Sequence, residues 1–123
     1  MIIKFDEMQV KELPAFYGGD GALLAHMFSD EKNKILRGKL VHGASIGLHT
    51  HETSSEIIFI LSGNGKSICD GKEELLTSGD CHYCPKGSEH CLMNIGEEDL
   101  CFYAVVHRKH LKRRKRRTSR LTN

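Results

Sequence analysis

The 123-residue sequence contains no tryptophan and only two prolines, but it has twelve glycines. This balance suits short strands joined by tight turns, because glycine adopts the backbone angles that such turns require. No apolar run approaches the roughly 20 residues of a membrane-spanning helix. Hydrophobic residues make up 39% of the chain and charged residues 28%. These values predict one globular domain and exclude disorder, collagen and coiled coil for most of its length.

Acidic residues are absent after Asp99, so the net charge of +2 hides two opposite parts. Residues 1–107 hold all sixteen Asp and Glu against nine Lys and Arg, a net charge of −7, and the other nine basic residues lie between Arg108 and Arg120. We expect residues 108–123 to form a disordered, solvated basic tail. If the tail contacts nucleic acid at all, the contacts are nonspecific, through phosphates, since it has no aromatic side chain for base stacking.

The five cysteines are odd in number, and the N-terminus lacks the features of a secretory signal. Both observations favour reduced thiols in a cytoplasmic protein. Cys81 and Cys84 have the spacing of a redox or zinc-binding pair. The stretch around them is predicted to be a strand, however, where positions three apart point to opposite sides. We therefore expect buried, inert cysteines.

Short apolar or alternating runs separated by turn signals predict β-strands over most of the chain. The predicted strands are residues 2–5, 22–28, 35–41, 46–51, 56–61, 66–69, 73–76, 81–84, 90–94 and 100–106. Residues 6–13 are expected to form a brief helix or an irregular arm. Strands that recur about every eight to twelve residues predict an antiparallel sandwich or barrel.

Three histidines and one glutamate stand out on this framework. His49 and His51 lie at the end of a predicted strand, where the period of two places both imidazoles on one face. Glu56 begins a very apolar strand, and a carboxylate there is costly to bury without a cationic partner. His90 begins another strand after the turn at Pro85. A single histidine would be read as an ordinary surface or core residue, but three imidazoles and a carboxylate that converge form a site for a first-row transition metal.

Two stretches carry a more specific pattern. Residues 43–63 read Gly-x5-His-x-His-x4-Glu-x6-Gly, and residues 79–94 read Gly-x5-Pro-x-Gly-x2-His-x3-Asn. In order and spacing they resemble the two signature motifs of the cupin superfamily, and the chain is similar to small single-domain bacterial cupins of the mannose-6-phosphate isomerase-like type. The likeness extends loosely over residues 22–106.

The resemblance implies an all-β fold, the double-stranded β-helix or jelly-roll barrel of cupins, over residues 22–107. An N-terminal arm of residues 1–21 would precede the barrel, and the basic tail would follow it. The resemblance also implies one divalent transition metal (Fe, Mn, Ni, Co or Zn), with four ligands: His49, His51, Glu56 and His90. The sequence departs from the family pattern at His42, where proline is common, and we expect a rim residue there rather than a fifth ligand.

The surroundings of the metal are less well determined, and no catalytic residue can be assigned. By alternation from His90, Asn94 is predicted to face inward. Arg37 lies on a strand before the first motif, where a guanidinium could clamp a carboxylate; the alternative is a solvated strand residue. Arg37 and Asn94 are therefore the candidate substrate-binding residues. For the last strand, alternation leaves both Phe102 and Tyr103 open as the inward-facing side chain.

Two classes of function are compatible with this site. The first is a metal-dependent enzyme that acts on a small oxygenated metabolite as a dioxygenase, isomerase, decarboxylase or lyase. The second is a non-catalytic, metal-dependent module that binds a small molecule or a sugar. The expected partners are a small-molecule ligand and a second copy of the chain, since the strand predicted at residues 2–5 would leave edges that pair into a homodimer.

Overall fold

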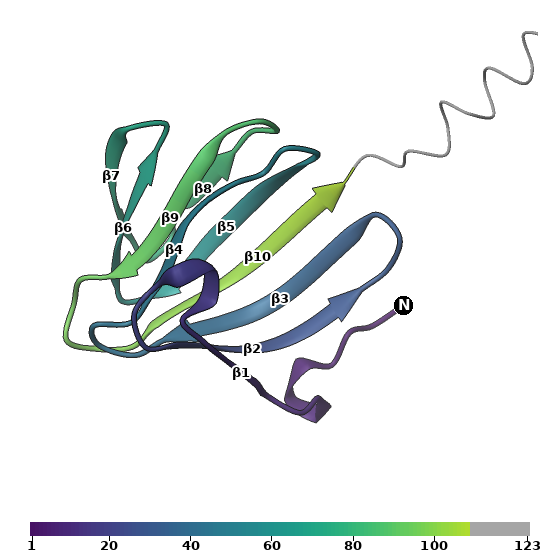
Figure 1. The fold of residues 1–123 in the computed structure, drawn as a ribbon. Coiled ribbons are helices and arrows are strands. Elements are labelled where there is room, and N and C mark those ends of the chain that lie inside the picture. Colours follow the sequence, from purple (N-terminus) through teal and green to yellow (C-terminus); the bar gives the residue numbers. More distant parts are fainter. Residues whose placement is uncertain (109–123) are drawn as a thin grey trace, which may run out of the picture.

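The computed structural model describes residues 1–108, so the basic tail predicted at 108–123 lies outside the described residues except for Arg108. Two antiparallel sheets face each other (Figure 1), one of six strands in the order β1-β2-β3-β10-β5-β8 and one of four in the order β4-β9-β6-β7. The strands are β1 Lys11–Pro14, β2 Ala22–Ser29, β3 Asn33–Leu40, β4 Ser45–Thr50, β5 Ser54–Ser62, β6 Asn64–Cys69, β7 Lys72–Thr77, β8 Cys81–Cys84, β9 Glu89–Asn94 and β10 Leu100–Arg108. Short 3-10 turns are η1 (Phe5–Glu7) and η2 (Phe16–Gly18). The predicted jelly roll is confirmed, and none of the described helices is long and apolar enough to cross a membrane.

Nine of the ten predicted strands are present, with bounds within two residues of those predicted. The prediction for residues 2–5 is wrong, because that segment is irregular up to η1. The first strand is instead β1, which lies largely in the segment expected to be helical or irregular. Only Leu13 of β1 is partly buried, and the strand is held by its pairing with β2. Because an edge strand of this kind buries almost no side chains, its sequence shows no alternation of apolar and polar residues.

The core lies between the two sheets, and β10 runs through the middle of the larger one, between β3 and β5. Burial decides which alternate residues of this strand face inward. Leu100, Phe102 and Ala104 all face the core. Phe102 packs over Gly38 on β3, where an added Cβ would lie 2.5 Å from the ring. Glycine at position 38 therefore leaves the space that the phenyl ring fills.

A sharp corner at Gly63 passes the chain from one sheet to the other. Gly63 alone separates the end of β5, in the six-stranded sheet, from the start of β6, in the four-stranded sheet. Its φ of +92° favours glycine, and an added Cβ would collide with the carbonyl oxygen of Asp99. The last glycine of the first motif is thus required where the chain changes sheets.

Residues 15–19, which contain η2, lie against β4 and cover one side of the space between the sheets. The contact is between backbones: an added Cβ at Gly47 would collide with the carbonyl oxygen of Tyr17, and one at Gly19 with that of Ser45. Ala15 and Tyr17 both have left-handed backbone angles, which side chains rarely adopt. The close packing on β4 holds this strained segment in place.

We expect Gly47→Ala to lower the free energy of unfolding by about 1–3 kcal/mol, because residues 15–19 must move away from β4 to make room for the methyl group. Gly96→Ala is the matched control, since an added Cβ there meets its nearest atom at an ordinary 3.5 Å; its effect should stay within about 0.5 kcal/mol. Urea denaturation of both variants measures the difference. Equal unfolding free energies would contradict the tight packing of this segment.

Candidate metal centre

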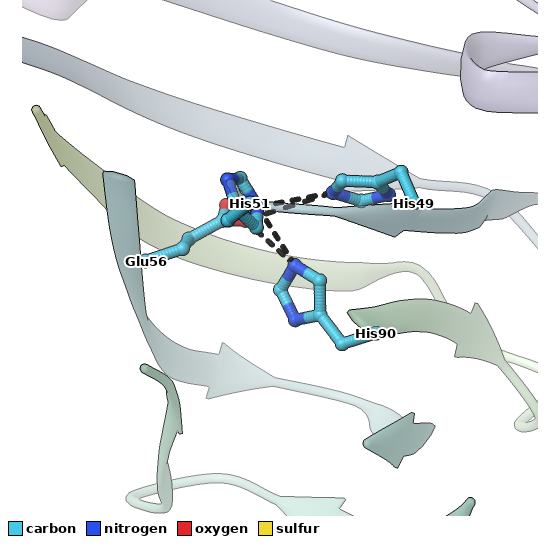
Figure 2. Close-up of side chains that lie close together, drawn as sticks. All are labelled: His49, His51, Glu56 and His90. Carbon is cyan, nitrogen blue, oxygen red and sulfur yellow. Dashed lines mark hydrogen bonds and ion pairs between the residues drawn. The ribbon is translucent and has the colours of Figure 1, made fainter. Parts of the chain in front are cut away.

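Three imidazoles and one carboxylate from both sheets meet at one end of the core (Figure 2). His49 lies on β4, His51 follows that strand directly, and His90 lies opposite His49 on the neighbouring strand β9. Glu56 comes from β5 in the facing sheet. The period of two predicted that His49 and His51 share a face, and the structure brings the four predicted ligands together.

The four side chains are closer to one another than hydrogen bonding alone explains. Nε2 of His51 lies 3.1 Å from Nε2 of His49, 3.1 Å from Nε2 of His90 and 2.8 Å from Oε1 of Glu56. A ring nitrogen has either one hydrogen or one lone pair, so it cannot satisfy three such neighbours by hydrogen bonds. A single cation at the centre would engage all of these atoms at once.

The separations also fit the size of a first-row metal ion. With bonds of about 2.1 Å, two ligands at right angles are roughly 3.0 Å apart and two on opposite sides roughly 4.2 Å. The close pairs, including His90 to Glu56 at 2.9 Å, match the shorter value. Nε2 of His49 and Oε1 of Glu56 are 4.0 Å apart, near the longer value. Three imidazoles and one carboxylate therefore form a divalent metal site that suits Fe, Mn, Co, Ni or Zn.

Hydrogen bonds on the outer ring nitrogens prepare the histidines for this role. Nδ1 of His49 donates to the carbonyl oxygen of Gly47 at 2.7 Å. A carbonyl oxygen only accepts, so Nδ1 carries the hydrogen and Nε2 keeps its lone pair free for a metal. The hydroxyl of Ser54 lies 3.0 Å from Nδ1 of His51 and can accept in the same way.

The charges of the site favour a bound cation. Burial by itself would raise the pKa of Glu56, but hydrogen bonds from His51 and His90 outweigh it and bring this pKa down to about 2. Glu56 is therefore a carboxylate at neutral pH. Burial also lowers the pKa of His49, with a further contribution from the neighbouring imidazoles. An anionic carboxylate beside a neutral imidazole is the protonation state in which these groups bind metals.

A small cavity adjoins the four ligands. Its lining is mainly apolar and includes Phe16, Leu23, Leu36, Ile46, Phe102 and Val106. Two polar side chains other than the ligands also line it, Tyr17 and Lys34. The ring of Tyr17 stacks on that of His49, with centroids 4.0 Å apart and planes 12° from parallel. Of the residues that the structure describes, the open side of the metal site thus faces mostly apolar side chains and the cationic Lys34.

The two residues predicted to bind substrate do not line this cavity. Arg37 points to the outside of the six-stranded sheet, where its guanidinium donates to the carboxylate of Asp6 at 2.7 Å. Asn94 does face inward, but its amide group bonds to the backbone at Leu40, Glu98 and Gly96. In this structure, therefore, both side chains hold parts of the chain together.

His42 is not part of the ligand cluster; it is exposed, and its ring contacts the carbonyl oxygen of Gly96. All five cysteines are free, as predicted. Cys84 is buried while Cys81 is exposed, so the two do point to opposite sides. The expectation of buried cysteines holds for Cys84 and Cys91 only. Burial raises the pKa of the Cys84 thiol to about 12, which keeps it protonated.

Sequence reasoning missed three side chains near the metal site: Tyr17, Lys34 and His82. His82 is buried on β8, and its alternation with Cys84 was a usable signal that it faces inward. Lys34 lies at the start of β3, on the same face as the core residue Leu36. No pattern points to Tyr17, because its position depends on the contact between residues 15–19 and β4.

Residues 37–106 match the Cupin domain family. Together with the jelly roll and the positions of the two motifs, this match shows that the chain belongs to the cupin family. The metal ligands expected from the motifs therefore lie where the fold of the family brings both motifs together.

Among its relatives is an oxalate-binding protein of Thermotoga maritima, 36% identical over 112 residues, which span 86% of this chain and 93% of the relative. A Thermotoga maritima crystal structure, described as a predicted oxalate decarboxylase, superposes with a TM-score of 0.83 at 30% identity and covers 89% of this chain and 100% of that one. An RmlC-like cupin from Shewanella frigidimarina shares the fold, with a TM-score of 0.73 at 15% identity over 88% of this chain and 90% of that one.

We expect Glu56→Gln to weaken divalent metal binding by at least about tenfold, because it removes the negative charge while keeping the shape of the side chain. His51→Ala and His90→Ala should weaken it by a similar or larger factor. His42→Gln serves as the control, because His42 lies outside the cluster. Chelator competition with Co(II), Mn(II) and Zn(II) measures the affinities, and circular dichroism checks folding. Unchanged affinity in Glu56→Gln would remove this residue from the ligand set.

Proposed function

We propose that this cupin binds a small carboxylate anion, with oxalate as the first candidate, through a divalent metal held by His49, His51, Glu56 and His90. The observation that carries the proposal is the position of Lys34. Among residues 1–108, it is the only Lys or Arg that lines the cavity beside the four ligands. A metal ion and an ammonium group in one apolar space together select for a compact anion.

The size of the cavity limits the ligand to a few atoms. About 40 Å³ is open to the centres of water-sized molecules, which is room for roughly three waters. A two-carbon dicarboxylate that replaces water on the metal fits this space. The small size of the cavity favours a compact anion over the sugar-binding alternative.

The charge around Lys34 supports the same ligand class. Within residues 1–108, Lys34 takes part in none of the ion pairs between basic and acidic side chains. A more open hollow adjoins the cavity and shares Lys34 with it, and Lys32 and Arg108 line this hollow as well. Three basic side chains therefore gather at the mouth of the site, although residues 1–107 are acidic overall. Such a local field attracts anions to the entrance.

The relatives add support of a different kind. The Thermotoga maritima oxalate-binding protein aligns over nearly its whole length with this chain. A shared fold alone would say little about the ligand, but 36% identity over 112 residues includes the segment that carries the ligands and Lys34. Oxalate is for this reason the first anion to test.

A catalytic version of the same site is the second candidate, and the structure described as a predicted oxalate decarboxylase favours it. A bound divalent metal would act as a Lewis acid toward the carboxylate oxygens. The protein would supply the charge of Lys34 and the hydroxyl of Tyr17 at the cavity wall. Against turnover, Glu56 is the only carboxylate that residues 1–108 contribute to the lining, and it is also a ligand. Release of carbon dioxide and formate from oxalate by the metal-loaded protein would distinguish turnover from binding.

We expect metal-loaded protein to bind oxalate and metal-free protein not to bind it. Lys34→Met should weaken oxalate binding by about 10- to 100-fold, the loss of one hydrogen bond to a charged group, with metal affinity unchanged. Lys39→Met is the matched control from the same strand, because Lys39 pairs with Asp99 outside the cavity. Isothermal titration calorimetry measures both affinities. Oxalate binding without metal, or equal affinity in the two variants, would contradict the proposal.

We also propose that the protein is a cytoplasmic homodimer. The five free thiols support a reducing compartment. Residues 2–5 form no strand that could pair between two copies, and the first strand, β1, pairs with β2 of the same chain. Its support is now an exposed apolar surface on the neighbouring strands β5 and β8, made by Phe59, Leu61 and Tyr83. β8 is also an edge strand of the larger sheet, and a second copy would cover both the edge and these side chains.

We expect Tyr83→Lys to shift the protein from dimer to monomer, because a charge would be buried in the interface without a partner. Leu75→Lys is the control, since Leu75 is also exposed but lies on β7 in the other sheet. Light scattering with size-exclusion chromatography measures the mass of each variant. An unaltered protein that is monomeric at micromolar concentration would rule out the dimer.

A further inference from the structure

His82 is a buried titratable side chain that the proposed ligand binding does not use. Its side chain is 0% exposed, and both of its ring nitrogens have partners. Nε2 lies 2.9 Å from Nδ1 of His90, and Nδ1 lies 2.7 Å from Oε1 of Glu74. His82 thus stands between a metal ligand and a carboxylate that is 36% exposed at the surface. Three strands contribute to this row of side chains: β7 carries Glu74, β8 carries His82 and β9 carries His90.

We infer that Glu74 and His82 act as a positioning pair that sets the tautomer of His90 and strengthens its bond to the metal. This inference rests on the metal site proposed above, and not on the identity of the anion. Its basis is the direction that each hydrogen bond must take, which follows from the chemistry of the groups.

The direction begins at Glu74. A carboxylate oxygen can only accept, so Nδ1 of His82 carries the hydrogen that it donates. In the neutral ring, Nε2 of His82 then has the lone pair and accepts from Nδ1–H of His90. That leaves Nε2 of His90 for a metal, which would replace the hydrogen bond between this nitrogen and Oε1 of Glu56, 2.9 Å away. Each step therefore prepares the nitrogen that faces the metal position.

The geometry of the two rings suits this arrangement. The planes of His82 and His90 are 16° from parallel, with centroids 5.1 Å apart. Nearly parallel planes allow the N–H of one ring to point along the lone pair of the other. His90 is 1% exposed, so no bulk water replaces His82 if that acceptor is removed. The orientation of His90 therefore depends on His82.

The negative charge of Glu74 acts on the metal position through the two rings. The charge stabilises the hydrogen on Nδ1 of His82, and through it the hydrogen on Nδ1 of His90. Nε2 of His90 thereby becomes a stronger electron-pair donor to a metal. The other two histidine ligands have neutral oxygen partners at their outer nitrogens, the carbonyl of Gly47 and the hydroxyl of Ser54. Only His90 among the three is linked to a carboxylate on its outer side.

The test compares neighbouring glutamates on β7. Glu74→Gln keeps an oxygen that can accept from His82 but removes the charge. Glu73→Gln removes a charge that is 64% exposed and paired with Lys66 at 3.5 Å, with no contact to the histidines. We expect Glu74→Gln to weaken Co(II) and Zn(II) binding by about tenfold and to shift the visible absorption of bound Co(II). Glu73→Gln should leave the metal affinity and the spectrum unchanged.

A second pair of variants separates orientation from packing. His82→Phe fills the space but leaves Nδ1–H of His90 without an acceptor, and we expect metal binding to fall by about 10- to 100-fold. His82→Gln restores an acceptor oxygen and should recover part of that loss. Nitrogen-15 NMR of the histidine rings in the metal-free protein reads the tautomer of His90 directly. Nδ1 of His90 should carry a hydrogen in the unaltered protein, and this preference should weaken in His82→Phe.

The outcomes distinguish this inference from the proposed function. Failure of the unaltered protein to bind any divalent metal would overturn the proposed function, while the NMR measurement would still decide whether His82 sets the tautomer of His90. Normal metal binding with equal affinities in Glu74→Gln, Glu73→Gln and His82→Phe would overturn the inference and leave the metal site intact. An unchanged His90 tautomer in His82→Phe would overturn it as well.

Discussion

The arrangement of this protein depends on the burial of one carboxylate among three imidazoles. Glu56 is only 8% exposed, and a carboxylate in such a place is costly unless cationic or hydrogen-bonding groups surround it. The histidines supply nitrogen atoms within 3 Å of its oxygen from two sides. Their own crowding leaves unsatisfied lone pairs and hydrogens, which one divalent cation resolves. One bound cation therefore accounts both for the buried carboxylate and for the close approach of the imidazoles.

This cluster requires two sheets held at a fixed separation. Glu56 comes from one sheet, and the three histidines come from β4, β9 and the residue that follows β4 in the other. His49 and His90 are directly opposite each other in the β4–β9 pair. A slip of one residue in either strand would turn an imidazole to the outer face. The core between the sheets and the corner at Gly63 oppose such a slip, so the stability of the barrel and the geometry of the site have the same source.

The two sides of the metal position differ in chemistry. On one side lies a small apolar cavity with Lys34 and Tyr17 in its wall, where a compact anion can replace water. On the other side His90 is connected through His82 to Glu74. An apolar opening and a hydrogen-bonded support are the two environments that a metal needs if it is to bind a ligand while its own ligands stay oriented.

The sequence by itself determined the fold class, nine of the strands and the four metal-ligand candidates. These features depend on local spacing: alternation places His49 and His51 on one face, and the glycines of the motifs mark turns with left-handed backbone angles. Tertiary structure alone decided the rest, because it depends on contacts between residues far apart in the chain. Arg37 bonds to Asp6 outside the cavity, while Lys34 on the same strand lines it. Alternation puts the two on opposite faces of the strand, but the fold decides which face turns inward. In the same way, Tyr17 reaches His49 only because Gly47 allows backbone contact, and His82 reaches both His90 and Glu74 only because three strands meet there.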